Sequence, residues 1–272
     1  MPHPGTYFYH PHVGVQLDRG LYGVLLVDDR REAGGYDAEW TVVLDDWVDG
    51  TGRTPDEVLA RLARSSGGMG ESMTSPLLGG AGDVVYPHYL INGRVAGAPD
   101  TFTGQPGLRV RLRLINAGTD TAFRVALAGH RMTVTHTDGF PVIPKTTDAL
   151  VIGMGERFDV EVTLDDGVFP LVAVAEGKVG AARGLIRTGV GRVPGESFRP
   201  SELNRRFYSA TTWPPRTACG WRPRLRTEVM TWCSAARWGA TRGTSTAESS
   251  PTARRCRSGK VNGSGCVSST AP

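Results

Sequence analysis

Two histidines near the start of the sequence have the spacing of metal ligands. They occur in Tyr7-Phe-Tyr-His10-Pro-His12, with a single proline between them. On an extended strand, residues i and i+2 share a face, with Cα atoms roughly 6–7 Å apart. Two imidazoles so placed can each bind one of two neighbouring metal ions, and imidazole suits copper, zinc and iron. Pro11 removes a backbone donor, which favours a strand edge or end. The motif is short, and two ordinary surface histidines would also fit it.

Other patterns for metal chemistry are weaker. His130, Met132 and His136 fall on one face of a predicted strand, which could form a histidine–methionine copper site. We favour a structural interpretation instead, with two partly exposed histidines beside a core strip. A zinc hydrolase of the His-x-His-x-Asp-His type is excluded, because Gly14 and Val15 stand where aspartate and histidine are required.

Residues near the histidine pair have two further interpretations. His3 could add a third nitrogen beside His10 and His12. Asp18 and Arg19 are expected to form a local ion pair that shapes the following turn. The alternative for these two residues is a role in orienting the metal ligands through hydrogen bonds.

The elements that must position these side chains follow the pattern of β-strands. Residues 108–114, 123–127 and 158–164 alternate apolar with charged or small side chains, as strands with one buried face do. Shorter strands and turn sequences such as Asn116-Ala-Gly118 fill the intervals, which predicts an all-β sandwich or barrel. The expected core consists of the apolar positions of the three segments: Val110, Leu112, Leu114, Phe123, Val125, Leu127, Phe158, Val160 and Val162.

One helix is expected after residue 54. Thr54-Pro-Asp-Glu57 is a capping box with proline at the first helical position. Val58, Leu59 and Leu62 would then form one apolar face. The helix is the exception in a chain that otherwise predicts strands.

The segment around the two histidines belongs to a longer pattern. Residues 5–27 read G-T-Y-F-Y-H-P-H-V-G-V-Q-L-D-R-G-L-Y-G-V-L-L-V. This closely resembles the end of the first domain of multicopper oxidases, where a G-T-Y/F-W-Y-H-x-H strand precedes a Q…G-L-Y-G-x-L-I-V segment. In that family both histidines bind the type 3 copper pair of a trinuclear cluster. The resemblance implies this role for His10 and His12.

The resemblance continues through Thr188 in elements typical of the family's second domain. They are W-T-V-V-L-D-D-W at residues 40–47, Y-L-I-N-G at 89–93, R-L-R-L-I-N-A at 111–117 and G-E-R-F-D-V at 155–160. The resemblance implies a cupredoxin-like (plastocyanin-like) Greek-key β-sandwich. We expect a remnant of a first cupredoxin domain at residues 1–37, the second cupredoxin domain at 38–190, and a linker with a disordered tail at 191–272.

The family's function is implied only in part. Complete laccase-like enzymes oxidise phenolic, amine or metal-ion reductants one electron at a time and reduce dioxygen to water. The family uses four histidine-rich motifs, and only the one with His10 and His12 occurs here. Without a His-Cys-His motif there is no type 1 copper. The expectation is therefore a truncated, inactive copper-binding chain that keeps type 3 ligands alone. The alternative is a copper-free cupredoxin-like binding or scaffold module.

Charge divides the chain into two parts. The net charge is +4, yet twelve of the 31 Lys/Arg and two of the 27 acids lie in residues 205–272, so that residues 1–204 carry a net −6. That basic segment holds all four cysteines and only one lysine, with little hydrophobic alternation. We favour out-of-frame translation as its origin over a basic arm for nucleic acid or an anionic surface. Nucleic acid is therefore not an expected partner.

The targeting signals in the sequence are few. No apolar run reaches the roughly 18 residues of a membrane span. The residues after Met1 lack the basic and apolar regions of a signal peptide, so a cytoplasmic location is the expectation as written. Complete relatives are often extracytoplasmic or secreted, and the oligomeric state is left open, an oligomer included.

Overall fold

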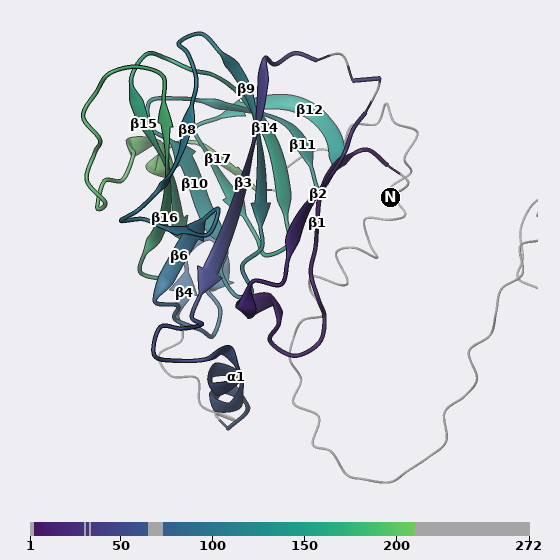
Figure 1. Cartoon of the computed structure of the whole chain (residues 1–272), viewed down its shortest axis with the longest axis vertical. Helices are drawn as coiled ribbons and strands as arrows, with labels where there is room; N and C mark the ends of the chain where they lie inside the picture. Colours follow the sequence, from purple (N-terminus) through teal and green to yellow (C-terminus); the bar gives the residue numbers. More distant parts are fainter. Residues whose placement is uncertain (1–2, 30, 33, 65–72, 210–272) are drawn as a thin grey trace, which may run out of the picture. The chain divides into compact units, whose positions relative to one another are not determined.

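Two large β-sheets dominate the computed structural model, which describes residues 3–29, 31–32, 34–64 and 73–209 (Figure 1). One sheet has the order β12-β11-β14-β9-β3-β6-β7, and the other β17-β13-β10-β15-β16-β8. The first consists of β12 (Phe140–Thr147), β11 (Met132–Thr137), β14 (Arg157–Thr163), β9 (Arg109–Asn116), β3 (Ala38–Trp47), β6 (His88–Ile91) and β7 (Arg94–Val95). The second consists of β17 (Phe207–Ser209), β13 (Ala149–Ile152), β10 (Phe123–Leu127), β15 (Val168–Ala175), β16 (Ala181–Arg187) and β8 (Asp100–Thr103).

The strand order makes this fold a cupredoxin-like Greek-key sandwich. Neighbours in the sheets are often distant in sequence: β3 pairs with β9 in parallel, and β16 pairs with β8 in parallel. The inward side chains of both sheets form one hydrophobic cluster. All nine residues of the expected core are buried, none more than 3% exposed, so the period-two prediction is confirmed.

Smaller elements lie outside the two sheets. They are the hairpin β1 (Gly5–Tyr9) and β2 (Gly23–Val27), the short pair β4 (Thr74–Ser75) and β5 (Gly79–Gly80), the helix α1 (Pro55–Arg64), and the 3-10 turns η1 (Leu17–Arg19) and η2 (Ser201–Asn204). None of the helices among the described residues is long and apolar enough to cross a membrane.

The predicted helix and its cap are confirmed. The Glu57 side chain accepts a hydrogen bond from the Thr54 backbone at 2.8 Å, and the Thr54 hydroxyl accepts one from the Glu57 backbone at 3.3 Å. The expected apolar face is only partly covered. Val58 packs on the core, whereas Leu59 and Leu62 stay 41% and 40% exposed.

The prediction that β9 leaves one face in water is wrong. Arg111 and Arg113, on the supposedly exposed face, are only 2% and 4% exposed. The hairpin β1–β2 and the segment before β3 cover them, and Figure 1 shows the hairpin running along the outer side of this sheet. β1 of the hairpin is anchored to this sheet, because Thr6 is fully buried.

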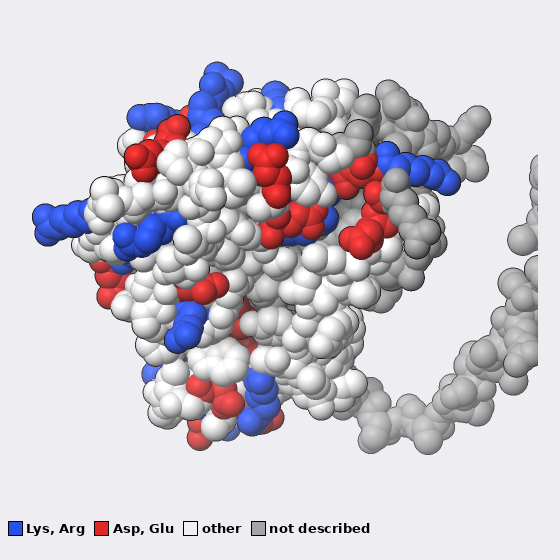
Figure 2. Space-filling view, turned by 45° about the horizontal axis from the view of Figure 1, so that its top comes forward, with Lys and Arg blue, Asp and Glu red and all other residues white. Residues whose placement is uncertain are grey.

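The second sheet continues beyond residue 190. η2 packs Leu203 against a small buried cluster, and β17 pairs in parallel with β13 from Ala149↔Phe207 to Val151↔Ser209. The predicted disorder of the tail from residue 210 onward lies outside the described residues. On the face drawn in Figure 2, basic and acidic side chains are interspersed among uncharged ones, as the near balance of charges in residues 1–204 leads us to expect.

Candidate metal centre

The two histidines of the His-x-His motif lie side by side just after β1. Their ring centroids are 4.6 Å apart, with the rings inclined by 38°. The His10 ring also stacks on Phe8, at 4.9 Å and 13°. The strand ends at Tyr9, so the histidines follow it rather than belong to it. Pro11 accounts for this, since it cannot donate a ladder hydrogen bond.

A backbone contact bears on which nitrogen of His10 is available. Its Nδ1 lies 3.2 Å from the Pro11 carbonyl oxygen. With the proton on Nδ1, the ring donates to that oxygen and leaves the Nε2 lone pair for a metal ion. His12 is exposed, so an ion could approach the pair from solvent.

The donor set fits part of a copper site and not a whole one. Imidazole nitrogens suit copper, but a protein site normally takes about three or four ligands. Within the described ranges, no group of three or more His, Cys, Asp or Glu side chains is placed to hold an ion. Within the described ranges, the two imidazoles thus provide two of the ligands that a complete copper site requires.

The alternative histidine–methionine site does not form. His130 is buried, with Nδ1 2.8 Å from the Ala128 carbonyl oxygen, and its Nε2 accepts a hydrogen bond from the Asp165 backbone at 3.0 Å. Met132 faces the core. A register shift between Val134 and His136 turns His136 to the outer face of the sheet. The expectation that these side chains share a face is wrong because the bulge interrupts the alternation.

The other predicted contacts near the histidines also differ. His3 precedes β1 and packs against the Phe140 ring, 5.7 Å between centroids, while His10 follows the opposite end of the strand. Asp18 and Arg19 do not pair with each other. Asp18 accepts a hydrogen bond from Tyr86, and Arg19 forms ion pairs with Asp49 and Asp56. Long-range partners have replaced the expected local pair.

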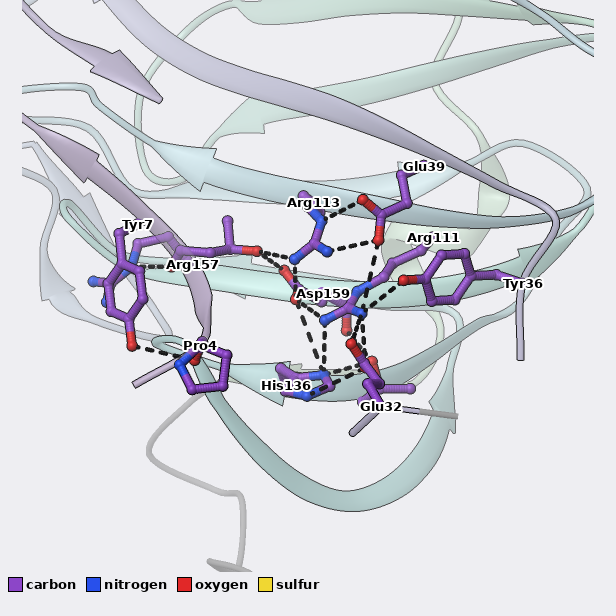
Figure 3. Close-up of polar contacts among 12 residues, drawn as sticks. Pro4, Tyr7, Glu32, Tyr36, Glu39, Arg111, Arg113, His136, Arg157 and Asp159 are labelled. Atoms are coloured by element: carbon purple, nitrogen blue, oxygen red, sulfur yellow. Dashed lines mark hydrogen bonds and ion pairs between the residues drawn. The ribbon is translucent and has the colours of Figure 1, made fainter. Parts of the chain in front are cut away.

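Beneath the hairpin lies a buried polar cluster that sequence reasoning missed (Figure 3). Its centre is Asp159 on β14, which is 1% exposed and accepts from Arg111 at 2.6 Å and from Arg113 at 3.3 Å. Glu39 pairs with Arg113 at 2.6 Å, and Glu32 pairs with Arg111 at 2.7 Å. The cluster consists of Thr6, Glu32, Tyr36, Glu39, Arg111, Arg113, His136 and Asp159. The one sequence signal was the run of arginines in β9, and it does not reveal what covers them.

The burial and the charges of the polar cluster shift the pKa values of Arg111 and His136. Burial opposes the charge of Arg111, but Asp159 and Glu32 outweigh it and raise the pKa of this guanidinium. Burial, and then the charge of Arg111, lower the pKa of His136. This shift favours the neutral imidazole of His136, and the arginine–carboxylate pairs hold the cluster together.

The turn of the hairpin has its own contact with the sandwich. The Tyr22 hydroxyl donates to Asp45 on β3 at 2.7 Å. Burial raises the pKa of Asp45 to about 8, and the nearby Asp46 adds to this. Asp46, buried beside it, accepts backbone hydrogen bonds from Thr119 and Asp120. The loop with His10 and His12 thus runs between a strand and a turn that both contact the sandwich.

The chain combines a cupredoxin-like sandwich with two adjacent imidazoles, and comparisons with known proteins identify its family. The sequence profile of the family described as Multicopper oxidase matches residues 38–192. The chain is 55% identical over 228 residues to "Multicopper oxidase MmcO" of Mycobacterium tuberculosis, covering 78% of this chain and 45% of that protein. It is 30% identical over 215 residues to "Copper resistance protein A" of Escherichia coli, covering 68% of this chain and 35% of that protein.

The solved structures agree on the fold. The crystal structure of Fet3p, described as a multicopper oxidase that functions in iron import, superposes with a TM-score of 0.58 at 22% identity, covering 74% of this chain and 37% of that one. The chain belongs to the multicopper oxidase family. It spans less than half the length of the curated relatives named above.

Proposed function

We propose that this chain is the part of a copper oxidoreductase that supplies His10 and His12 to the type 3 copper pair of a trinuclear centre. In the complete enzyme, a phenolic, amine or metal-ion reductant gives up single electrons and dioxygen is reduced to water. The observation that carries the proposal is the contact of the two imidazoles, 4.6 Å apart, at the end of β1. Membership of the multicopper oxidase family supports it.

The roles of this chain's own residues follow from their contacts. His10 and His12 would hold copper through ring nitrogens, and the copper centre, when filled, supplies the electron transfer to dioxygen. The Pro11 carbonyl would keep the His10 proton on Nδ1. The sandwich of residues 38–190, which we propose as a separate domain, would support the ligands without contributing one.

We further propose that a polypeptide of these 272 residues does not turn over by itself. It has no His-Cys-His sequence to form a type 1 site, and one His-x-His motif supplies only some of the trinuclear ligands. A copper-free binding module is the second candidate. The observation in its favour is that the described residues gather no three metal-binding side chains.

Copper titration of the untagged chain separates these functions. We expect weak Cu(II) binding by calorimetry, loss of most of it in His10→Ala/His12→Ala, and no blue thiolate absorption. His88→Ala is the matched control, since His88 is an exposed histidine on β6, outside the His-x-His motif. No binding by the unmodified chain would favour the copper-free module, and binding that survives in the double variant would show that His10 and His12 are not the ligands. Dioxygen consumption by the isolated chain with a phenolic reductant would overturn the proposed inactivity.

A further inference from the structure

Thr6 contacts the sandwich through both hydrogen-bonding functions of its hydroxyl. The hydroxyl donates to Asp159 Oδ1 at 2.6 Å and accepts from an Arg113 guanidinium nitrogen at 2.8 Å. Its backbone carbonyl accepts from Arg157 Nε at 3.2 Å. Thr6 is 0% exposed, so water cannot replace these bonds. The position of β1 is therefore specified by polar geometry as well as by packing.

The partners of Thr6 are themselves held in place. Asp159 and Arg113 lie directly opposite each other in the β14–β9 ladder. Arg113 is also bound to Glu39 through two of its nitrogens. A buried ion-pair network whose hydrogen bonds are mostly satisfied holds its side chains in place, because moving one of them leaves a buried charge unpaired. Thr6 thus contacts a rigid part of the sandwich.

The neighbouring residue leaves little room for β1 to shift. A Cβ added to Gly5 would come 2.5 Å from the carbonyl oxygen of Gly139, in the turn between β11 and β12. The backbone of β1 therefore lies directly against that turn. Gly5 also has a φ of 146°, which side-chain-bearing residues rarely adopt.

The contacts of Thr6 restrict the position of His10 through β1 and Phe8. Thr6 and Phe8 point to the same side of β1, and His10 lies just beyond the end of that strand. Phe8 stacks on the His10 ring. A displacement of Thr6 would therefore move the imidazole of His10.

The other end of the histidine loop is held by Tyr22. Its hydroxyl donates to the buried Asp45 of β3. Tyr22 precedes Gly23, which pairs with Tyr9 in the hairpin, and the Tyr9 ring lies over Gly23. Hydroxyl groups therefore help to tie both ends of the loop that carries His10 and His12 to the sandwich.

We propose that Thr6, held by Arg113 and Asp159, and Tyr22, held by Asp45, are positioning residues that set the separation and orientation of His10 and His12 for copper. The sandwich then does more than fill space next to the copper ligands: its buried charges fix the strand that carries them. This inference rests on the proposed function of His10 and His12.

Isosteric removal of the Thr6 hydroxyl tests the inference. Thr6→Val should weaken Cu(II) binding about tenfold or more, the range for partners that orient metal ligands. It should also alter the hyperfine splitting of bound Cu(II) in electron paramagnetic resonance. Thr6→Ser keeps the hydroxyl and should restore both. The matched control is Thr133→Val, which removes a 3.0 Å hydroxyl contact between Thr133 on β11 and Thr146 on β12.

Two further measurements keep the test decisive. Without copper, amide exchange at residues 7–9 should be faster in Thr6→Val and unchanged in Thr133→Val. Tyr22→Phe leaves the sandwich core untouched and should also weaken copper binding, so it replaces Thr6→Val if that variant does not fold. No copper binding by the unmodified chain would overturn the proposed function. Normal binding with unchanged affinity and spectra in Thr6→Val and Tyr22→Phe would overturn the positioning role alone.

Discussion

Asp45→Asn should remove a large part of the pH dependence of folding. Asp45 is 2% exposed, receives the Tyr22 hydroxyl at 2.7 Å and adjoins the buried Asp46. Burial is the main cause that raises the pKa of Asp45 from 3.8 to about 8, and the charges of Asp46 and Asp18 act in the same direction. The Tyr22 hydrogen bond opposes the shift and is outweighed.

The direction of the pH dependence of stability follows from the raised pKa of Asp45. The folded chain holds the Asp45 proton more tightly than the unfolded chain, so this contribution to stability is complete below about pH 4 and is lost as the pH rises through about 8. Each unit of pKa difference corresponds to about 1.4 kcal/mol. From pH 5 to pH 8 the folded state should therefore lose up to about 4 kcal/mol through Asp45.

Urea unfolding followed by circular dichroism at pH 5, 6.5 and 8 measures this loss. The asparagine side chain keeps an acceptor for Tyr22 and cannot ionise, so Asp45→Asn should lose much less stability over the same range. Glu156→Gln is the matched control, because burial raises the pKa of Glu156 to about 7. This replacement should leave the loss of folding stability that is due to Asp45 unchanged. Equal pH slopes in the unmodified chain and Asp45→Asn would refute the reasoning.

Two further variants test the fold itself. Leu114→Ala empties a fully buried position between the sheets and should lower the free energy of unfolding by about 2–5 kcal/mol in urea denaturation; a loss below about 1 kcal/mol would contradict the packing described. Thr54→Ala removes the cap of α1 and should cost about 1 kcal/mol, with Thr54→Ser as the control that retains the hydroxyl; equal stability of the alanine and serine variants would show that the cap contributes nothing.

Local patterns in the sequence were sufficient for the elements of the sandwich. Alternation in β9, β10 and β14 identified core residues such as Leu112 and Phe123, because successive side chains of a strand point to opposite faces. The capping box located α1, because its hydrogen bonds join residues three apart. The adjacency of His10 and His12 also followed from their spacing.

Alternation cannot show what lies on the other face of a strand. Arg111 and Arg113 looked solvent-exposed in sequence, yet a hairpin about a hundred residues earlier covers them. One extra residue at the bulge in β11 was enough to put His136 on the opposite face from the one expected. No local signal announces such a bulge.

Local spacing was therefore enough to predict the strands, their buried faces and the proximity of the two histidines, since each depends on residues a few positions apart. The partners of the polar side chains, in contrast, depend on the tertiary fold. Asp18 meets Tyr86, Tyr22 meets Asp45, and Thr6 meets Asp159 across 153 positions of sequence. A buried charge or hydroxyl must be satisfied, but any well-placed partner can do so, and chain topology alone brings that partner into reach.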